Sequence, residues 1–449
     1  MSSIYIKNVN IINPFSEEPL EERHVLIENG RIKSLHTEES SLYKDHIVID
    51  GEDDYLLPGF IDSHAHIMAN GFHKEDIMKN PLSYYFYNAV SNMKATIDAG
   101  VTTVRDTGLA DIGVKMAQER KIFPAPRLNI SIKPLAITGE HFDFYLNSGF
   151  DMELAYPGFP IGTCDGVEGV LKKTREVIRA RADFIKIMAS GGILSPNTSP
   201  EFAQFNKKEL KVIVDEAENY NLKVAAHCHS LEGIERCAKA GVKSIEHGTF
   251  IDKKTSQLLA KKRMYLTPTL VVHHTLIKEG FPVWDNFADD KVKKLKEVVK
   301  IQKENISTAY EEGVSFLMGS DCGVIDHGRN LGELKYLVDV GLSPLEAIQA
   351  GTIEGARFFN QENDLGSIEA GKIADMIIVK ENPIDKIESL ANNDNILTVL
   401  QDGIVKRTTN LGWGYKEVTR ELAEQLGGLK VKAGNDANMA ALGEMWLGA

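Results

Sequence analysis

The sequence has no long hydrophobic run, few cysteines and no signal-like N-terminus. No stretch of about eighteen apolar residues occurs among its 449 residues, which argues against a transmembrane helix. The first residues lack the basic and then apolar segments of a secretory signal peptide. The four cysteines form no Cys-X-X-Cys pair, so we expect reduced thiols in a cytoplasmic protein.

The chain also lacks an excess of positive charge. Its 64 acidic residues outnumber its 51 basic residues, and the formal net charge of -13 argues against nucleic acids and anionic membranes as partners. A cationic or neutral small substrate is compatible with this balance. The length suits a large barrel with an accessory domain rather than one small core.

Both ends of the chain are rich in short strands. Tight-turn signals occur at 28–31 and 401–404. Neither end has enough strands to bury a core alone, so we expect one small composite β-sandwich domain from residues 1–57 and 364–408. Residues 409–449 are expected to be a poorly packed extension without a chemical role. The strands are expected at 4–12, 24–32, 47–49, 374–379 and 396–400.

The middle of the chain, residues 58–363, alternates apolar runs with helix-like segments such as 207–220 and 231–240. Eight such repeats predict an α/β fold, a (β/α)₈ TIM barrel. An open doubly wound sheet is the alternative, but the strand count and the lack of a glycine-rich phosphate loop argue against it. The eight apolar runs lie at 56–66, 101–104, 128–137, 184–188, 224–227, 244–247, 265–271 and 314–321.

The first of these runs ends in a His-X-His motif, His64 and His66. Residues i and i+2 of a strand point to the same side, so both imidazoles can reach one metal ion. Taken alone, the motif also fits a strand that carries two histidines for structural reasons.

Other ionisable residues lie at the ends of later runs, where the strands of a barrel converge on one mouth. They are Lys186, His227, His247 and Asp321. Histidine nitrogens and carboxylate oxygens suit zinc and related divalent ions. Each residue has a structural alternative, such as a surface lysine, a core histidine or a helix cap. A shared metal site explains all of them together.

The order His-X-His, Lys, His, His, Asp resembles the amidohydrolase superfamily, and the resemblance extends to about residue 407. It implies that Lys186 is carboxylated by carbon dioxide and bridges two divalent ions, with zinc expected. His64, His66 and Asp321 would complete one metal site. His227 and His247 would complete the other.

Four further segments resemble a metal-dependent dipeptidase group described as prolidase-like, which cleaves dipeptides with C-terminal proline or with C-terminal arginine or lysine. His229 and the Asp-His-Gly at 326–328 look more like the arginine carboxypeptidase branch. The family shows Gly-Gly-His where this chain has Glu140 before His141, which puts the substrate pocket in doubt. The resemblance implies a small peptide substrate and a homo-oligomer. The four segments are 139–141, 189–192, 226–230 and 319–328.

The expected reaction is hydrolysis of an amide bond. Divalent ions lower the pKa of a water molecule, and Asp321 would take its proton and later deliver it to the leaving amine. His141 and His229 are candidates to bind the substrate's carbonyl oxygen or carboxylate, with ordinary loop structure as the alternative. A basic substrate side chain needs an acidic partner. The candidates are Asp326, Glu140 and Asp143.

The sequence thus predicts a metal-dependent hydrolase of dipeptides or short peptides with C-terminal arginine or lysine. An Xaa-Pro dipeptidase, or an amide or lactone hydrolase with the same metal site, is the alternative. Lys186 argues against a mononuclear imidazolonepropionase-like or deaminase-like enzyme. Asp321, which a purely structural metal site does not need, argues against a non-enzymatic metal-binding protein.

Overall fold

The computed structural model describes residues 3–39, 46–71, 80–140, 142–145, 148–154, 156–193, 198–280 and 288–408. The expected extension 409–449 and the candidate substrate-binding residue His141 lie outside the described residues. Within the described ranges, no helix has both the length and the apolar character needed to pass through a lipid bilayer.

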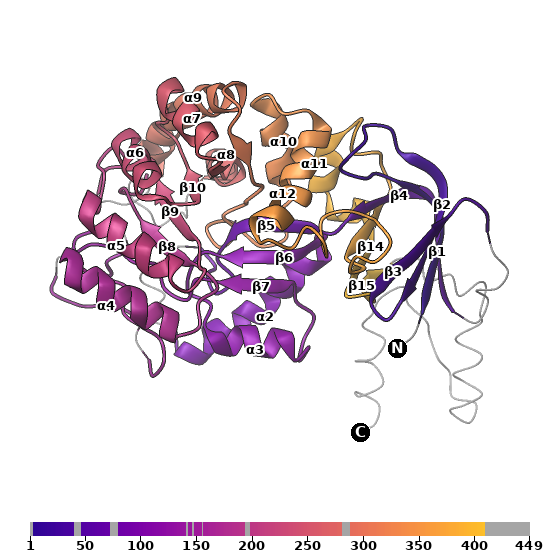
Figure 1. Cartoon of the computed structure of the whole chain (residues 1–449), viewed down its shortest axis with the longest axis horizontal. Helices are drawn as coiled ribbons and strands as arrows, with labels where there is room; N and C mark the ends of the chain where they lie inside the picture. The colour runs from indigo at the N-terminus through magenta and orange to yellow at the C-terminus, as the bar shows by residue number, and fades with distance from the viewer. Residues whose placement is uncertain are drawn as a thin grey trace.

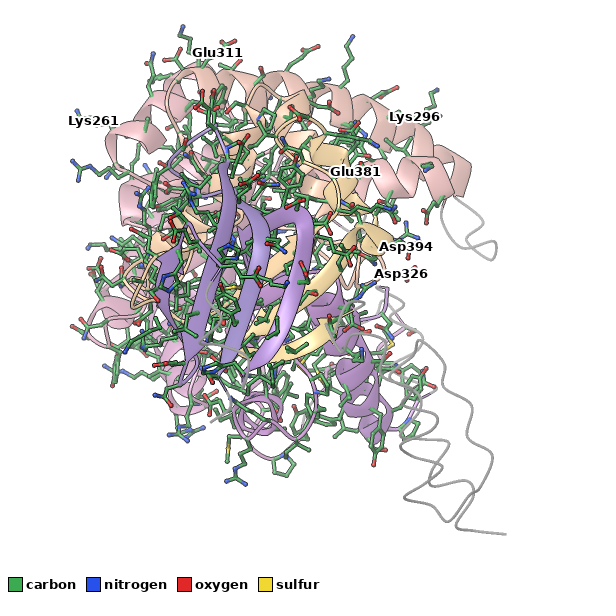
Figure 2. All side chains as sticks on the ribbon, turned by 90° about the vertical axis from the view of Figure 1, so that its right-hand side faces the viewer. Lys261, Lys296, Glu311, Asp326, Glu381 and Asp394 are labelled. Atoms are coloured by element: carbon green, nitrogen blue, oxygen red, sulfur yellow. The ribbon has the colours of Figure 1, made fainter. Side chains whose placement is uncertain are left out.

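Seven strands from the two ends of the chain form one sheet. They are β1 (Ile4–Ile11), β2 (Leu20–Glu28), β3 (Arg31–His36), β4 (Ile47–Pro58), β13 (Met376–Val379), β14 (Ile396–Gln401) and β15 (Ile404–Thr408). The strand order is β15-β14-β13-β4-β1-β2-β3, so the ends meet where β4 pairs with β13. Figures 1 and 2 show the yellow C-terminal strands beside the indigo N-terminal strands.

The two turns expected at 28–31 and 401–404 are confirmed. Asn29 and Gly30 have φ of 53° and 79°, and Asp402 and Gly403 have φ of 52° and 65°. Positive φ at both central residues matches the twist of the flanking strands. The turns also touch, because a Cβ atom on Gly30 would lie 2.8 Å from the carbonyl oxygen of Asp402. The two chain ends therefore pack backbone against backbone.

The middle of the chain forms two parallel sheets, with orders β5-β6-β7 and β12-β11-β10-β9-β8. Neighbouring strands are consecutive in the sequence, as expected for strands joined by helical crossovers. The bounds of these strands are β5 (Phe60–Ala65), β6 (Val101–Asp106), β7 (Arg127–Ile130), β8 (Ile185–Met188), β9 (Val224–Cys228), β10 (Ser244–His247), β11 (Tyr265–Thr267) and β12 (Ser315–Phe316).

The sequence suggested one strand over the apolar run 56–66, but the structure divides this run between two strands of different sheets. β4 ends at Pro58 and β5 begins at Phe60. Gly59 lies between them against Thr102, whose side-chain atoms would be 2.5 Å from an added Cβ. A side chain does not fit at this close approach, so the chain changes sheets at glycine.

The outer strands of the two parallel sheets are linked at both sides. Ser63 N donates to Met318 O at 2.8 Å, and Leu135 forms a parallel bridge with Ile187. Two expected strands are shorter than their apolar runs. β7 ends before Ile132, which has φ of 64°, and β12 contains two residues. Loop conformation therefore replaces strand where the run 128–137 approaches β8.

Helices surround the parallel strands on the left of Figure 1. The helices expected at 207–220 and 231–240 are confirmed within two residues. Asn206 and Glu209 form a capping box, and Ser230 caps the next helix by accepting from Gly233 N. The helices are α2 (Leu82–Asp98), α3 (Ile112–Glu119), α4 (Gly166–Arg179), α5 (Lys207–Glu218), α6 (Leu231–Ala240), α7 (Lys253–Lys261), α8 (Leu270–Glu279), α9 (Ala288–Glu311), α10 (Gly332–Asp339), α11 (Pro344–Ala350) and α12 (Ile353–Phe358).

The contact between the two chain ends can be tested at Gly30. Gly371→Ala is the control, because Gly371 also has positive φ but no atom within 4 Å of an added Cβ. We expect the control to lower the free energy of unfolding by about 1 kcal/mol. Gly30→Ala should cost about 1–3 kcal/mol more, because it clashes with Asp402. Denaturant unfolding measures both, and equal losses would contradict a tight contact between the turns.

Candidate metal centre

The six residues expected to bind metal lie at or just beyond the carboxyl ends of parallel strands, and all six side chains are buried. Residues at the carboxyl ends of parallel strands lie along the same edge of the sheet. Asp321 comes directly beside β5, because its backbone N donates to His64 O at 2.7 Å. The six are His64 on β5, His66 after it, Lys186 on β8, His227 on β9, His247 on β10 and Asp321 after β12.

Asp321 lies between the two histidines of the His-X-His motif. Its Oδ1 is 3.4 Å from Nε2 of His64 and 3.4 Å from Nε2 of His66. Burial by itself would raise the pKa of Asp321, but the two imidazoles bring that pKa well below its usual value. The side chain is therefore a carboxylate at neutral pH, which is the form that binds metal ions.

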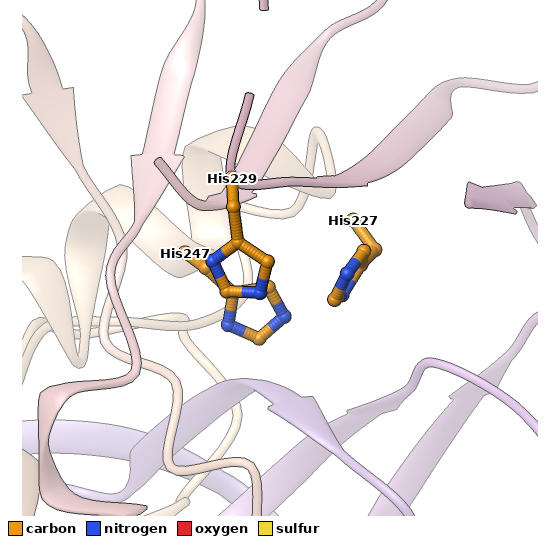
Figure 3. Close-up of side chains that lie close together, drawn as sticks. All are labelled: His227, His229 and His247. Carbon is orange, nitrogen blue, oxygen red and sulfur yellow. The ribbon is translucent and has the colours of Figure 1, made fainter. Parts of the chain in front are cut away.

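Three imidazoles form a second group (Figure 3). The ring centroid of His227 is 4.6 Å from that of His247 and 4.7 Å from that of His229, and the rings of His229 and His247 are stacked. One ligand atom from each of the three lies within 4.8 Å of the others. The same holds for His64, His247 and Asp321, so His247 connects the two groups.

Lys186 reaches this region from β8 and is 2% exposed. Burial lowers the pKa of Lys186 to about 8, although the charges of Glu246 and Asp321 oppose this effect. A large fraction of the side chain is therefore a neutral amine near pH 8. A neutral amine is the form that reacts with carbon dioxide.

Three of the imidazoles are oriented as metal-binding histidines usually are, with Nδ1 facing an acceptor. Nδ1 of His64 faces Glu246 at 2.8 Å, and Nδ1 of His66 faces Gly108 O at 3.3 Å. Nδ1 of His247 faces the hydroxyl of Thr269 at 2.6 Å, and that hydroxyl donates its hydrogen to a backbone carbonyl. All three partners accept, so each Nδ1 carries a proton, and Nε2 is the atom left to bind a metal ion in place of its own proton. These residues fit divalent ions.

Three residues of the site have a left-handed backbone conformation. His247 has φ of 72°, Asp321 has φ of 55° and Thr269 has φ of 52°. Histidine and aspartate adopt a left-handed conformation more readily than most residues, but it is unfavourable for a β-branched threonine. Such strain persists where the surrounding structure requires it, and it is concentrated at functional sites.

Sequence reasoning missed three charged residues behind the ligands. Glu246 and Arg105 form a fully buried ion pair that contacts His64. Asp106 accepts from the backbone of Ile67 at 2.7 Å, and burial raises its pKa to about 6. The available signal was a charged residue inside a short apolar strand, where burial without a partner is costly.

His229 is 2% exposed, and its Nδ1 lies 2.8 Å from the hydroxyl of Thr249. The three candidate acidic partners differ in their surroundings. Asp326 is 87% exposed beside Arg329 and is labelled in Figure 2. Glu140 and Asp143 accept hydrogen bonds from backbone N–H groups of their own loop. These contacts do not favour any one of the three as the partner of a basic substrate side chain.

Comparison with known proteins identifies the family. The model of the amidohydrolase family matches residues 55–405, which include every strand from β5 to β14. The chain belongs to the amidohydrolase family. The resemblance inferred from the His-X-His, Lys, His, His, Asp order is therefore confirmed.

Relatives within the family have different activities. Ochratoxinase of Aspergillus niger is 29% identical over 378 residues, covering 80% of this chain and 77% of the relative. Imidazolonepropionase of Thermoplasma volcanium is 23% identical, covering 86% and 90%. The crystal structure of an Xaa-Pro dipeptidase with methionine in its active site is 32% identical with a TM-score of 0.82, covering 90% of this chain and 99% of that chain.

The two threonines behind the imidazoles allow a matched test. Thr269→Val removes the acceptor of His247, so we expect the affinity for one metal ion to fall about tenfold. Thr249→Val makes the same change behind His229 and should leave metal affinity unchanged, because His229 is expected to bind substrate. Competition with a chelator measures both. Loss of metal affinity in Thr249→Val would contradict the assignment of His229.

Proposed function

We propose that this protein is a metal-dependent hydrolase that cleaves the amide bond of dipeptides or short peptides, most readily those with C-terminal arginine or lysine. The observation that carries the proposal is the proximity of Asp321, His64 and His66 to the group around His247. The likeness to an Xaa-Pro dipeptidase structure supports a peptide substrate.

In this proposal His64, His66 and Asp321 hold one divalent ion, and His227 and His247 hold another, with zinc expected. Carboxylated Lys186 would bridge the two. The pKa of about 8 for Lys186 supports this modification, because the amine must be neutral to form a carbamate. Bound ions of this kind supply Lewis acidity and lower the pKa of water.

The chain's own residues would position the reactants and move protons. Asp321 is buried and ionised, so it can accept a proton from the attacking water and deliver it to the leaving amine. His229 adjoins His227 and His247 and would bind the carbonyl oxygen or the carboxylate of the substrate. His141 has the same proposed role and lies outside the described residues.

The proposed scaffold is a (β/α)₈ barrel of residues 58–363 with a composite β-sandwich domain of residues 1–57 and 364–408. The links from β5 to the segment after β12, and from Leu135 to β8, support closure of the two parallel sheets into one barrel. The pairing of β4 with β13 supports a domain built from both ends.

Hydrolysis of Xaa-Pro dipeptides is the second candidate. A prolidase structure complexed with N-methylphosphonate-L-proline is 31% identical with a TM-score of 0.81, covering 90% of this chain. Glu140 and Asp143 accept hydrogen bonds within their own loop and Asp326 is exposed, which weakens the case for a substrate with a basic side chain.

A substrate panel decides between these candidates. We expect kcat/KM for Xaa-Arg and Xaa-Lys to exceed that for Xaa-Pro by about tenfold or more. A proline substrate would leave the acidic partner of the basic side chain unpaired, and that is costly. Aromatic amides and lactones serve as comparison substrates. Faster cleavage of Xaa-Pro would support the second candidate, and no cleavage of any peptide would contradict both.

The role of Lys186 can be tested by metal content. Protein supplied with zinc and bicarbonate should contain about two ions per chain. Lys186→Ala should lose at least one ion and most activity, because both metal positions share this ligand. The control is Lys133→Met, which removes another buried lysine, one that pairs with Glu153 instead. It should keep both ions, and a normally active Lys186→Ala variant would refute the binuclear scheme.

A further inference from the structure

A buried ion pair lies among the parallel strands behind His64. Arg105 on β6 and Glu246 on β10 have no exposed side-chain surface, and Nη2 of Arg105 lies 2.8 Å from each carboxylate oxygen of Glu246. Glu246 also contacts His64, whose Nδ1 is 2.8 Å from Oε2 of the glutamate. Glu246 therefore connects Arg105 directly to a candidate metal ligand.

The pair is held in one orientation. Nε of Arg105 donates to Ser63 O, and Nη1 donates to the hydroxyl of Ser244 at 2.9 Å. That hydroxyl donates to Oε1 of Glu246 at 2.6 Å, and the guanidinium lies 4.8 Å from the ring centre of Phe358. Each oxygen of Glu246 thus accepts two hydrogen bonds, which restricts its rotation.

Stability alone does not explain a charged pair at this position. Desolvating two charges costs about as much as their attraction returns, and well-packed apolar residues often replace such a pair without loss. Apolar branched side chains are the usual filling between closed parallel strands. The contact of Glu246 with His64 indicates that this ion pair also acts on a candidate metal ligand, which a purely structural ion pair would not do.

The partners of the imidazoles are also unequal. His64 donates to a carboxylate, His66 to the carbonyl of Gly108, and His247 to the hydroxyl of Thr269. A carboxylate partner makes an imidazole a stronger ligand than a neutral acceptor does. Among these three ligands, His64 therefore has an anionic partner, whereas His66 and His247 have neutral ones.

We propose that Arg105 and Glu246 are positioning residues for the metal site of His64, His66 and Asp321, and that this site fills first. Glu246 holds His64 with Nε2 directed at the ion, and Arg105 holds Glu246 in place. This inference rests on the metal centre of the proposed function but not on the identity of the substrate.

Metal binding to the purified metal-free chain tests the inference without any activity assay. Titration with Zn²⁺ or Co²⁺ against a competing chelator should resolve a tight and a weaker site in the unaltered protein. Glu246→Gln should weaken the tight site about 10- to 100-fold and leave the weaker site within about twofold.

The double variant Arg105→Met/Glu246→Gln separates positioning from stability. Glu246→Gln alone leaves Arg105 buried without a counter-charge and should unfold more easily. Removing both charges should restore the unfolding midpoint but not the affinity of the tight site. If the single variant does not fold, the double variant alone decides.

Arg127→Met is the control for a lost ion-paired arginine, because Arg127 is partly buried and pairs with Asp375 and Asp402 instead of the candidate ligands. It should unfold more easily with unchanged metal affinity. Unaltered affinity in a folded Glu246→Gln variant, or restored affinity in the double variant, would overturn the inference. Two bound ions without peptide cleavage would instead overturn only the proposed substrate, whereas an unaltered chain that binds no ions would overturn both.

Discussion

The hydrogen bonds between β5 and the segment after β12 are the constraint on which the candidate metal centre depends. Asp321 N donates to His64 O. This bond places Asp321, which follows the last parallel strand β12, beside His64 on the first parallel strand β5. Asp62 strengthens the link, because its carboxylate accepts from the backbone of Ser320 and of His64. Asp321 can therefore lie between two imidazoles, with its own backbone in the left-handed region at φ of 55°.

Compensated burial of charge is the second constraint. Lys186, Arg105 and Glu246 are withdrawn from water close to the imidazoles, where an isolated charge would be costly. Glu246 is the common partner: it pairs with Arg105, contacts His64 and raises the pKa of Lys186 against the effect of burial. The orientation of His64 and the pKa of Lys186 thus depend on a residue that is not itself a candidate metal ligand.

The seven-stranded sheet is attached to the parallel strands at more than one point. β4 continues into β5 across Gly59, and Gly59 N donates to Asp375 O at 2.9 Å. Arg127 at the start of β7 binds Asp375, which directly precedes β13, and Asp402, which lies in the turn between β14 and β15. The sheet therefore supports the end of the parallel strands opposite the candidate ligands, because these contacts are made where β5 and β7 begin.

The sequence by itself determined the family, the turns and the two capped helices, because these depend on residue type and local spacing. Asn29-Gly30 can adopt positive φ, and Ser230 can cap a helix, whatever lies around them. Tertiary structure alone decided the lengths of the strands, the division of the run at Gly59 and the pairing of Glu246 with Arg105. These features depend on atoms from distant segments, such as Thr102 against Gly59, which no local pattern contains.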